Sequence, residues 1–477
     1  MFDRFIRLQA RLRPEALAIV TPSRQVTFAA FDADIDRIAA ALGDLAPDKG
    51  EAVALAVADP YRHWLLTLAL ARRGFASASG NDAGCRLRVS DGSVHPTQDS
   101  AEALTLSFED VLRAPPKELA PRAKPAPDDV ARVLLSSGTT GQAKRVGLTW
   151  RIVEAALRNV PQTYRAEQDG RWLAMTGPTT ILGFVLTLGA WATGNALVLL
   201  EDRPLTADVL RGLRPTLIGM VPFQLADLVA ALPKRFSPSS SLTLVTGGSP
   251  LPLPLAREAR GLLTHDLRSV YGMSECGAVA IADTAVLEQA PGAAGYVLPD
   301  VDLAIVDDRG QPVPAGSAGH IRIRSPRGIS AYLDEADGTA TPFAEGWFQP
   351  GDIGRLRDDG LLLVEGRADD LINLGGHKVL PSLIEREVMT CRGVGEVAAF
   401  AVADEVGLDR CWLAIVPGAD FAGDELETCV GRSMPWLRNL FWVTVESIPR
   451  NGGGKVDRIE LRRAAEAFLA RSKTAAN

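Results

Sequence analysis

The amino-acid sequence predicts an α/β protein in which a large N-terminal domain of α/β subdomains plus a β-subdomain precedes a small α+β C-terminal domain. Three observations support this fold class. The chain has 477 residues, which is more than a single hydrophobic core usually serves. Helical and strand-like patterns alternate through most of it, and the pattern becomes mainly strand-like from Val301 and changes again after Arg367. We therefore expect domains over residues 1–367 and 368–477.

The N-terminal domain begins with alternating strands and helices. The predicted pairs are strand 26–28 with helix 32–42 and strand 52–57 with helix 64–71. Two later apolar runs, residues 217–221 and 242–246, have the length and composition of buried parallel strands. Because ligands of such sheets bind beyond the carboxyl ends of the strands, we expect the functional site at that edge.

Residues 172–200 carry no charged side chain and are long enough to cross a bilayer. Proline, glycine and asparagine interrupt this stretch, and the turn signal at residues 193–195 precedes a short strand-like run at 196–200. We interpret the stretch as a buried helix followed by a strand, and a membrane span is the alternative.

The β-subdomain is predicted from residues 301–306 and 320–324, the second of which alternates strictly between apolar and polar residues. It closes near residue 365. The C-terminal domain is then expected to contain helix 384–389, strands 397–402 and 412–416, and a helical tail from Ile459.

Composition limits the classes of partner. With 47% hydrophobic and 23% charged residues the chain is typical of a globular protein, and its net charge of −7 disfavours nucleic acid or an anionic membrane as main partner. Five scattered cysteines without a Cys-x-x-Cys motif indicate neither a disulfide framework nor a zinc site. The first residues lack the apolar core of a signal peptide, so we expect a cytoplasmic protein without a membrane span.

Residues 134–146 contain an apolar strand that runs into a loop rich in hydroxyls and glycines, as in phosphate-binding loops. The glycines let backbone N–H groups turn toward an anion, and the hydroxyls add donors. Lys144 follows three residues after the last glycine and no Ser or Thr follows it, so the loop is not a Walker A motif. A simple polar turn is the alternative. The candidate phosphate ligands are Ser136, Ser137, Gly138, Thr139, Thr140, Gly141 and Lys144.

This loop resembles the phosphate-binding signature of the adenylate-forming superfamily, which includes acyl- and aryl-CoA synthetases, luciferases and peptide-synthetase adenylation domains. Ala143 and Arg145 stand where that family usually has proline and glycine. Further segments follow in the order of the family along nearly the whole chain. The resemblance implies a mobile C-terminal domain, the cofactors ATP, Mg²⁺ and CoA, and a catalytic role for Thr139.

Two segments resemble the parts that hold adenine and the phosphates. Residues 246–252 resemble the loop along the adenine and the acyl pocket, and residues 271–275 resemble the Tyr-Gly-x-Thr-Glu motif. The resemblance implies that Tyr271 stacks on adenine, Ser274 contacts phosphate and Glu275 binds Mg²⁺ as a metal ligand and catalytic residue. Oxygen ligands suit this hard cation. Alone, each segment is an ordinary turn. The further nucleotide-binding residues here are Gly247, Gly248, Ser249 and Gly272.

Residues 347–352 resemble the ribose-binding motif, with Pro350 in place of threonine. The resemblance implies that Asp352 accepts hydrogen bonds from both ribose hydroxyls, which suits an acceptor-only carboxylate. Residues 366–370 resemble the motif between the domains, which implies that Arg367 contacts the nucleotide and Asp369 is the hinge.

Residues 449–458 resemble the loop that brings a catalytic lysine, here Lys455, into the active site. A mobile ammonium can neutralise two anions that approach each other. A flexible solvated loop is the alternative. Residues 370–381 resemble the version found in CoA ligases, in which Gly375 and Gly376 flank the thiol tunnel, so we favour CoA over the thiol of a separate acyl carrier protein.

The acid is expected to contact residues from several segments. Thr180 stands where many acyl-CoA synthetases have a gating histidine. The segments expected to line the pocket contain no Lys, Arg or His, so we expect no cation there to pair with a second carboxylate. This predicts a monocarboxylic acid, either aromatic or short-to-medium aliphatic. The candidate pocket residues are Thr180, Gly183, Phe184, Phe223 and Met273.

Together these motifs predict an AMP-forming acid–thiol ligase. Such an enzyme uses MgATP to convert a small-molecule carboxylic acid into an acyl-adenylate, and a thiol then displaces AMP. The competing hypothesis is a non-catalytic nucleotide-binding relative, favoured by the departures at Ala143, Arg145, Thr180 and Pro350.

Overall fold

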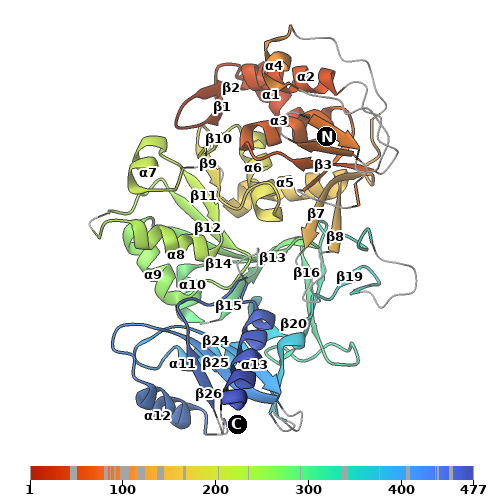
Figure 1. The fold of residues 1–477 in the computed structure, drawn as a ribbon. Coiled ribbons are helices and arrows are strands. Elements are labelled where there is room, and N and C mark those ends of the chain that lie inside the picture. The colour runs from red at the N-terminus through yellow and green to blue at the C-terminus, as the bar shows by residue number, and fades with distance from the viewer. Residues whose placement is uncertain are drawn as a thin grey trace. The chain divides into compact units, whose positions relative to one another are not determined.

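The computed structural model describes two compact units of the chain (Figure 1). The first comprises Met1–Asp302 and Ile323–Phe348, and the second comprises Leu303–Arg322 and Gln349–Asn477. The residues described are 2–42, 51–79, 84–85, 87–90, 93–96, 107–115, 124–136, 144–164, 168–201, 203–234, 236–290, 292–334, 342–374, 377–403, 409–435, 437, 440–450 and 455–475. From the sequence, we expect a mobile C-terminal domain to begin at residue 368. That boundary depends on how the domain moves, so it stays a prediction.

One sheet of the first unit has a parallel centre with antiparallel strands at both ends. Its strand order is β2-β1-β10-β9-β11-β12-β13-β14-β15, in which the strands from β1 to β13 run parallel. The strands are β1 (Leu17–Val20), β2 (Gln25–Thr27), β9 (Arg171–Ala174), β10 (Ala196–Val198), β11 (Leu217–Met220), β12 (Thr243–Gly247), β13 (Asp266–Met273), β14 (Gly277–Asp283) and β15 (Ala293–Val297). The predicted runs at 217–221 and 242–246 are the neighbours β11 and β12.

The second sheet of this unit has the order β6-β5-β3-β4-β7-β8, with parallel pairing among β5, β3, β4 and β7. Its strands are β3 (Ala52–Ala56), β4 (Ala76–Ser79), β5 (Leu87–Ser90), β6 (Ser93–Pro96), β7 (Val130–Ser136) and β8 (Lys144–Thr149). β7 and β8 pair antiparallel, so they bring together the two ends of the predicted phosphate loop.

Helices connect and cover these strands. They are α1 (Arg4–Leu12), α2 (Phe28–Ala41), α3 (Pro60–Arg72), α4 (Phe108–Arg113), α5 (Trp150–Tyr164), α6 (Ile181–Ala192), α7 (Ala207–Leu213), α8 (Pro222–Ala231), α9 (Leu253–Leu262) and α10 (Thr284–Gln289). Side-chain oxygens cap several N-termini, as Asp59 does for α3 and Thr206 for α7. The stretch 172–200 contains the expected helix and strand, α6 and β10. In the part of the chain that the structure describes, no helix is both long and apolar enough to cross a membrane.

An ion-pair network joins the first three helices. Arg72, at the end of α3, lies 3.3 Å from Asp3 and 2.9 Å from Asp36, and its guanidinium also pairs with Asp32. Nearby, the Tyr61 hydroxyl donates to Asp34 at 2.7 Å. Because the Arg72 side chain is only 3% exposed, its charge is compensated almost entirely by these carboxylates.

Short antiparallel strands lead from the first unit into the second. β17 pairs with β20 and β20 pairs with β21, whereas β19 pairs with β17 and β18. The strands are β16 (Asp302–Val306), β17 (Gly319–Arg324), β18 (Phe343–Ala344), β19 (Trp347–Phe348), β20 (Asp352–Leu356) and β21 (Leu361–Arg367). The predicted β-subdomain is thus made of strands.

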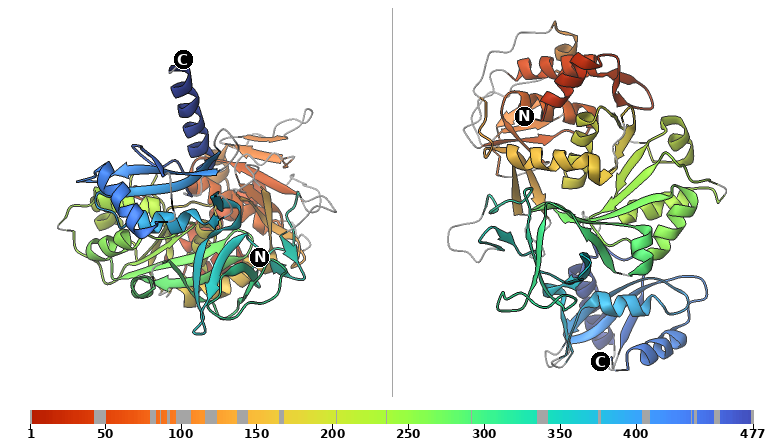
Figure 2. Two further views of the ribbon diagram at one scale, coloured as in Figure 1. Left: turned by 90° about the horizontal axis from the view of Figure 1, so that it is seen from below. Right: turned by 180° about the vertical axis from the view of Figure 1, so that it is seen from behind.

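The rest of the second unit is the predicted small α+β fold (Figure 2). In its three-stranded sheet, β24 pairs antiparallel with β25 and β25 parallel with β26. Alternate β24 side chains pack with α11 and α12 on one face and with α13 on the other. The elements are η1 (Ala368–Asp370), β22 (Ile372–Leu374), β23 (His377–Val379), α11 (Pro381–Val388), β24 (Val394–Ala403), β25 (Asp409–Pro417), α12 (Gly423–Ser433), β26 (Phe441–Thr444) and α13 (Arg458–Ala475).

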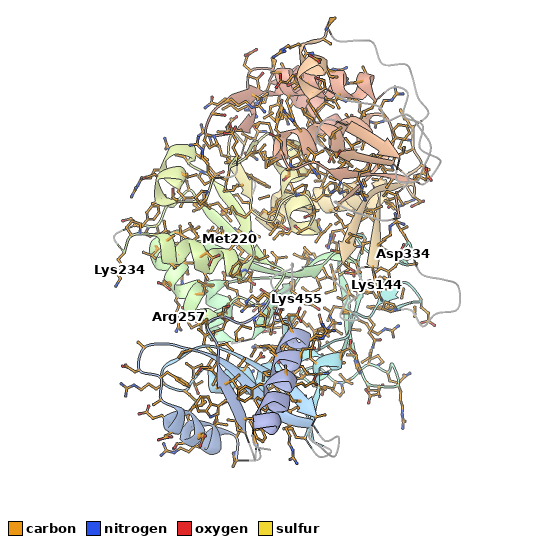
Figure 3. The ribbon with its side chains drawn as sticks, viewed as in Figure 1. Lys144, Met220, Lys234, Arg257, Asp334 and Lys455 are labelled. Carbon is orange, nitrogen blue, oxygen red and sulfur yellow. A yellow bond between two sulfur atoms is a disulfide. The ribbon has the colours of Figure 1, made fainter. Side chains whose placement is uncertain are left out.

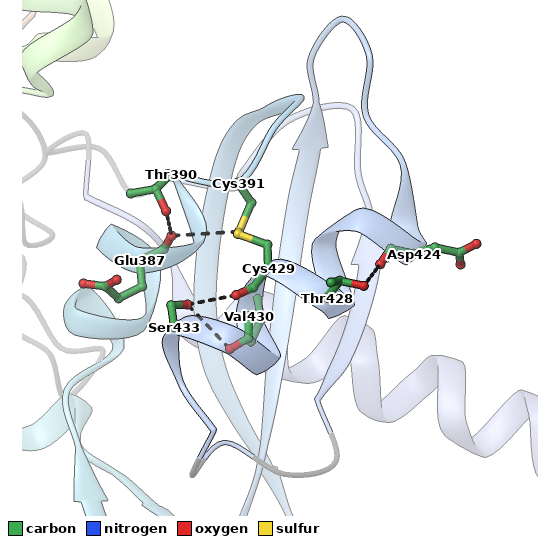
Figure 4. The surroundings of a disulfide bond; sticks show 8 residues. All are labelled: Glu387, Thr390, Cys391, Asp424, Thr428, Cys429, Val430 and Ser433. Carbon is green, nitrogen blue, oxygen red and sulfur yellow. Dashed lines mark hydrogen bonds between the residues drawn. A yellow bond between two sulfur atoms is a disulfide. The ribbon is translucent and has the colours of Figure 1, made fainter.

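A disulfide bond corrects one expectation from the cysteine spacing. Cys391, just after α11, is bonded to Cys429 in α12, with 5.9 Å between their Cα atoms (Figure 4). The two cysteines are 38 residues apart in sequence, and only the packing of α11 against α12 brings them together. The scattered spacing of the cysteines therefore did not reveal this disulfide bond.

Candidate functional site

The predicted phosphate loop lies between two paired strands. Ser136 ends β7 and Lys144 begins β8, and these two residues are direct partners in the antiparallel register. The intervening candidates lie outside the described residues, so their roles stay predictions. They are Ser137, Gly138, Thr139, Thr140 and Gly141. The hairpin brings a hydroxyl and a lysine to the two ends of the loop.

Lys144 lies against an aromatic ring that the sequence motifs did not identify. Its Nζ is 4.5 Å from the centroid of the Tyr332 ring, a cation–π distance. The segment carrying Tyr332 is fixed to β8, because the Leu333 N–H donates to the Arg145 carbonyl at 2.9 Å and Asp334 accepts from the Arg145 N–H at 3.2 Å. Lys144 and Asp334 are labelled in Figure 3. The Arg145 guanidinium, which the glycine usual in the family would lack, also donates to Asp334 at 3.4 Å.

Glu275 is linked to the same tyrosine. It lies in the turn between β13 and β14 and is 8% exposed. The Tyr332 hydroxyl donates to its Oε1 at 3.1 Å, and the Glu275 carbonyl accepts from the Ile329 N–H at 2.9 Å. Tyr332 therefore contacts both the lysine and the carboxylate that the sequence motifs place at the phosphates. A single tyrosine after a strand gave no sequence signal for this position.

The two predicted adenine segments follow neighbouring parallel strands. β12 ends at Gly247 and β13 at Met273, and Gly247 is paired with Val270. Gly248 adopts a φ of +90°, which favours glycine, and precedes Ser249. The carboxyl ends of β12 and β13 therefore lie at one edge of the sheet, as the sequence predicted for a ligand site.

Tyr271 and Gly272 lie at a bulge in β13. At Gly272, an added Cβ would lie 2.4 Å from the Gly277 carbonyl oxygen on β14, so a larger residue would force the two strands apart. Tyr271 and Ser274 are half-buried beside this bulge. The close approach explains locally why this motif contains glycine.

In the second unit, three predicted residues form one cluster. Asp352 and Arg367 are partners in the β20–β21 register, and their side chains approach to 3.5 Å. Arg367 also donates to the Pro350 carbonyl at 3.0 Å and lies 3.7 Å from Asp369. Since the main-chain oxygen of Pro350 serves as acceptor, the missing threonine hydroxyl is not needed for this contact. Asp352 is 8% exposed.

Asp369 and its neighbour Asp370 differ in what they contact. Asp370 pairs with Arg458 at 3.4 Å, and Arg458 also pairs with Glu385 of α11 at 2.6 Å. The Asp369 side chain is 64% exposed. The predicted hinge residue is thus less constrained than the residue that follows it. Gly375 and Gly376, predicted to flank the thiol tunnel, lie outside the described residues.

Lys455, which is labelled in Figure 3, is exposed and directly precedes Val456. Arg450 and Val456 form an isolated antiparallel bridge, and the Asp457 N–H donates to the Pro449 carbonyl at 2.8 Å. Backbone pairing thus holds the described ends of this lysine loop.

The predicted acid-pocket residues have diverse surroundings. Thr180 caps α6 by accepting from the Gly183 N–H at 3.0 Å, and a Cβ on Gly183 would lie 1.8 Å from the Gly177 carbonyl oxygen. Phe184 is fully buried and stacks on Trp64 with 5.9 Å between the ring centroids. Its contacts are those of a core residue. By contrast, Phe223 is 52% exposed on α8, and Met273 is half-buried at the end of β13.

The segments predicted to line the pocket contain no cation, but a buried arginine from another strand lies beside one of them. Arg132 of β7 donates to the Pro178 carbonyl at 3.0 Å, and its guanidinium carbon lies 5.4 Å from the centroid of the Phe184 ring. Sequence reasoning missed this arginine because it examined only the residues within the pocket segments. β7 is distant from them in sequence and adjacent in the fold.

Comparison with known proteins identifies the class of enzyme. A family model described as AMP-binding enzyme matches residues 81–333, and the chain belongs to this family. It is 25% identical to a 2-succinylbenzoate–CoA ligase of Bacillus cereus, covering 96% of this chain and 98% of the relative. It is 30% identical to an indoleacetate–CoA ligase of Aromatoleum aromaticum, covering 69% of this chain and 66% of the relative.

The fold resembles that of a solved CoA synthetase. The o-succinylbenzoate CoA synthetase of Bacillus subtilis, in complex with its acyl-adenylate intermediate, superposes with a TM-score of 0.81 at 23% identity, covering 96% of this chain and 97% of that chain. The same synthetase with ATP and magnesium ion gives a TM-score of 0.82, also at 23% identity, with 96% and 98% coverage. The predicted fold class and adenylate-forming resemblance are confirmed, and the protein is an ATP-dependent acid–CoA ligase.

Proposed function

We propose that this ligase activates an aromatic monocarboxylic acid and transfers its acyl group to CoA in the cytoplasm, with the described clusters acting on the nucleotide. The observation that carries the proposal is the contact of Tyr332 with both Lys144 and Glu275 beside the phosphate-loop hairpin. These side chains come from three separate parts of the sequence. Their convergence supports a nucleotide site at the ends of β7, β8 and β13.

The proposed reaction has two displacement steps. An oxygen of the acid carboxylate attacks the α-phosphorus of ATP, the bond to pyrophosphate breaks, and an acyl-adenylate forms. The sulfur of CoA then attacks the acyl carbonyl carbon, AMP leaves, and the thiol proton passes to solvent. Adenylation is needed because a carboxylate is a poor electrophile and oxide a poor leaving group. AMP is a far better leaving group than oxide.

Glu275 fits the role of a Mg²⁺ ligand. Among the described residues, no group of three or more His, Cys, Asp or Glu side chains could hold a metal ion, so a complete protein cage is not formed there. One carboxylate together with ATP phosphate oxygens and waters suits Mg²⁺. When bound, the ion would neutralise phosphate charge. Tyr332 orients the Glu275 carboxylate through Oε1, and its ring supports Lys144, which would contact a phosphate.

Residues of the second unit would have the further roles that the sequence motifs imply. Asp352 would accept from the ribose hydroxyls, with Arg367 placed to contact the nucleotide. Lys455 would neutralise charge as the carboxylate approaches the α-phosphate. Rotation at Asp369 would then separate the adenylation and thioester steps. Gly375 and Gly376 would border the path of the thiol.

The aromatic character of the acid is supported by two observations. The two relatives compared above are named for 2-succinylbenzoate and indoleacetate, which both contain an aromatic ring. 2-Succinylbenzoate carries two carboxyl groups, whereas indoleacetate carries one. In addition, Phe223 is largely exposed on α8 and so is accessible to a ligand. Arg132 weakens the original argument against a second carboxylate, but its guanidinium is fully buried and donates to neutral oxygens. Because this buried guanidinium is not available to pair with a second carboxylate, we propose a monocarboxylate, and a dicarboxylate such as 2-succinylbenzoate is the alternative.

Acid-dependent exchange of labelled pyrophosphate into ATP tests this proposal. The panel contains benzoates, cinnamates, fatty acids, dicarboxylates and amino acids, and each active acid is then tested for thioester formation with CoA. We expect strongest exchange with an aromatic monocarboxylate, and much weaker exchange by Glu275→Gln. Clear preference for dicarboxylates or amino acids would contradict the proposed acid. Binding of ATP without exchange for any acid would instead support the non-catalytic alternative for the site.

A further inference from the structure

Arg132 is a fully buried cation whose hydrogen bonds all go to neutral groups. Its terminal nitrogens donate to the Ser77 and Ser79 hydroxyls and to the Pro178 carbonyl, each at 3.0 Å. Its residue exposure is 0%. Among the residues that the structure describes, no Asp or Glu pairs with it. Its positive charge is therefore compensated only by dipoles.

This arrangement is costly for folding. Burial lowers the pKa of the Arg132 guanidinium to about 9, because the charged form is disfavoured away from water. An apolar side chain of similar length would fill the same space without that penalty. Arg132 is thus a poor choice for stability alone. Its guanidinium provides several N–H donors in a fixed geometry, which hold the Ser77 and Ser79 hydroxyls and the Pro178 carbonyl relative to one another.

Of the three groups that Arg132 contacts, the Pro178 carbonyl belongs to the turn between β9 and α6. This turn contains Gly177, with a φ of +68°, and Pro178, and it ends at the capping residue Thr180. Gly183 lies so close to the Gly177 carbonyl that an added Cβ would clash with it, so the turn packs directly against the start of α6. Arg132 ties the turn to β7, the strand that ends at Ser136 and leads into the phosphate loop. One side chain therefore connects the acid-side turn with the phosphate-loop strand.

We propose that Arg132 is a positioning residue that sets the turn at residues 175–180 relative to β7 and thereby orients the bound acid toward the α-phosphate. The proposal rests on the proposed function, since it assigns the acid to the α6 side of the site. The proposal about Arg132 goes beyond the proposed function, because Arg132 lies outside the family motifs identified above. Arg132 acts through the Pro178 carbonyl and does not itself touch the substrates.

The kinetic test compares Arg132→Met and Arg132→Lys with Ser77→Ala. The methionine variant removes the contact to Pro178, whereas Ser77→Ala removes a bond of the same guanidinium on its other side. In acid-dependent pyrophosphate exchange, we expect Arg132→Met to raise the KM for the acid about tenfold and the KM for ATP by less than about twofold. Arg132→Lys should recover part of the loss, and Ser77→Ala should resemble the wild type.

Amide hydrogen exchange of residues 175–184 in the substrate-free protein gives a second readout that needs no activity. We expect faster exchange in Arg132→Met than in the wild type and no change in Ser77→Ala. Unchanged exchange in Arg132→Met, or equal increases in the KM values for acid and ATP, would overturn the inference. Absence of activity in the wild type would overturn the proposed function, and amide exchange would still decide whether Arg132 holds the turn.

Discussion

Arg72 and Arg132 are both buried in the first unit, but their surroundings are opposite. Burial would lower the pKa of Arg72, yet the nearby Asp32, Asp36 and Asp3 outweigh that effect and raise it. Arg132 has no such partners in the part of the chain that the structure describes, and burial lowers its pKa to about 9. Arg72 joins α1, α2 and α3, whereas Arg132 joins a strand to a turn. The comparison thus distinguishes Arg72, which holds three helices together, from Arg132, which positions a turn beside the candidate site.

Two tyrosines of the same unit repeat this contrast. Tyr61 donates to Asp34 in the N-terminal helical region, and Tyr332 donates to Glu275 beside Lys144. Both hydroxyls bond to a carboxylate, but only the second carboxylate belongs to a predicted nucleotide motif. If the comparison is sound, equivalent substitutions in the two regions should change different properties: stability in the helical region and activity at the site.

The largest effect on activity is expected from an exposed residue of the second unit. Lys455→Ala should lower acid-dependent pyrophosphate exchange about 10²–10³-fold, because it removes the charge that neutralises the reacting anions. Its melting temperature should stay near that of the wild type. With preformed acyl-adenylate and CoA supplied, much of the thioester rate should remain. Equal loss in both half-reactions would show that the lysine acts throughout or is structural.

The proposed hinge predicts the reverse pattern. Asp369→Pro should restrict rotation at φ and lower thioester formation at least about tenfold, while pyrophosphate exchange persists. Asp369→Ala is the control, since it removes the carboxylate but keeps backbone freedom. Both half-reactions are followed in each variant. A normal overall rate in Asp369→Pro would place the hinge elsewhere.

The paired tyrosines provide a smaller and more selective test. Tyr332→Phe should raise the Mg²⁺ concentration required for half-maximal exchange about tenfold, because Glu275 loses a hydrogen bond that orients its carboxylate. Tyr61→Phe should leave that concentration unchanged and should lower the free energy of unfolding by about 1 kcal/mol. A magnesium titration and chemical denaturation of both variants measure these effects. The same Mg²⁺ requirement in both variants would contradict the proposal that Tyr332 orients Glu275 in the site.

A pH-dependent effect on stability is expected from His63, which is buried near Arg132. Burial, with a contribution from Arg132, lowers the pKa of His63 to about 3, well below its ordinary value of 6.5. The unfolded state therefore binds the proton more tightly, and stability falls as the pH drops from about 6.5 toward 3. Between pH 6.5 and 5, His63→Leu should remove about 1–2 kcal/mol of this fall. Parallel stability curves for variant and wild type would contradict the assignment.

Much of the fold was predictable because its signals are local. The strand runs at 217–221 and 242–246 became β11 and β12, and the interrupted apolar stretch at 172–200 contains α6 and β10. The family motifs also identified Asp352 and Arg367, which are paired across β20 and β21. In these cases, residue order and periodicity carry the information that determines the local structure.

The missed features depend on contacts between distant segments. Cys391 meets Cys429 only through the packing of α11 against α12, and Tyr332 reaches Glu275 across more than fifty residues of sequence. Arg132 lies beside Pro178 because β7 packs near the turn before α6. No spacing rule encodes such approaches. The pocket segments themselves contain no cation, so their sequence did not indicate Arg132 as a neighbour.

The most direct test of the comparison is the free energy of unfolding of Arg72→Met and Arg132→Met, measured by chemical denaturation under one set of conditions. Arg72→Met should lose about 3–5 kcal/mol, because it leaves the buried Asp3 carboxylate without its ion-pair partner and leaves, among the described residues, only Arg7 to pair with Asp32 and Asp36. Arg132→Met should remain within about 1 kcal/mol of the wild type, because it removes an uncompensated charge along with its hydrogen bonds. A loss in Arg132→Met as large as that in Arg72→Met would show that both arginines serve the fold alike and would contradict the account.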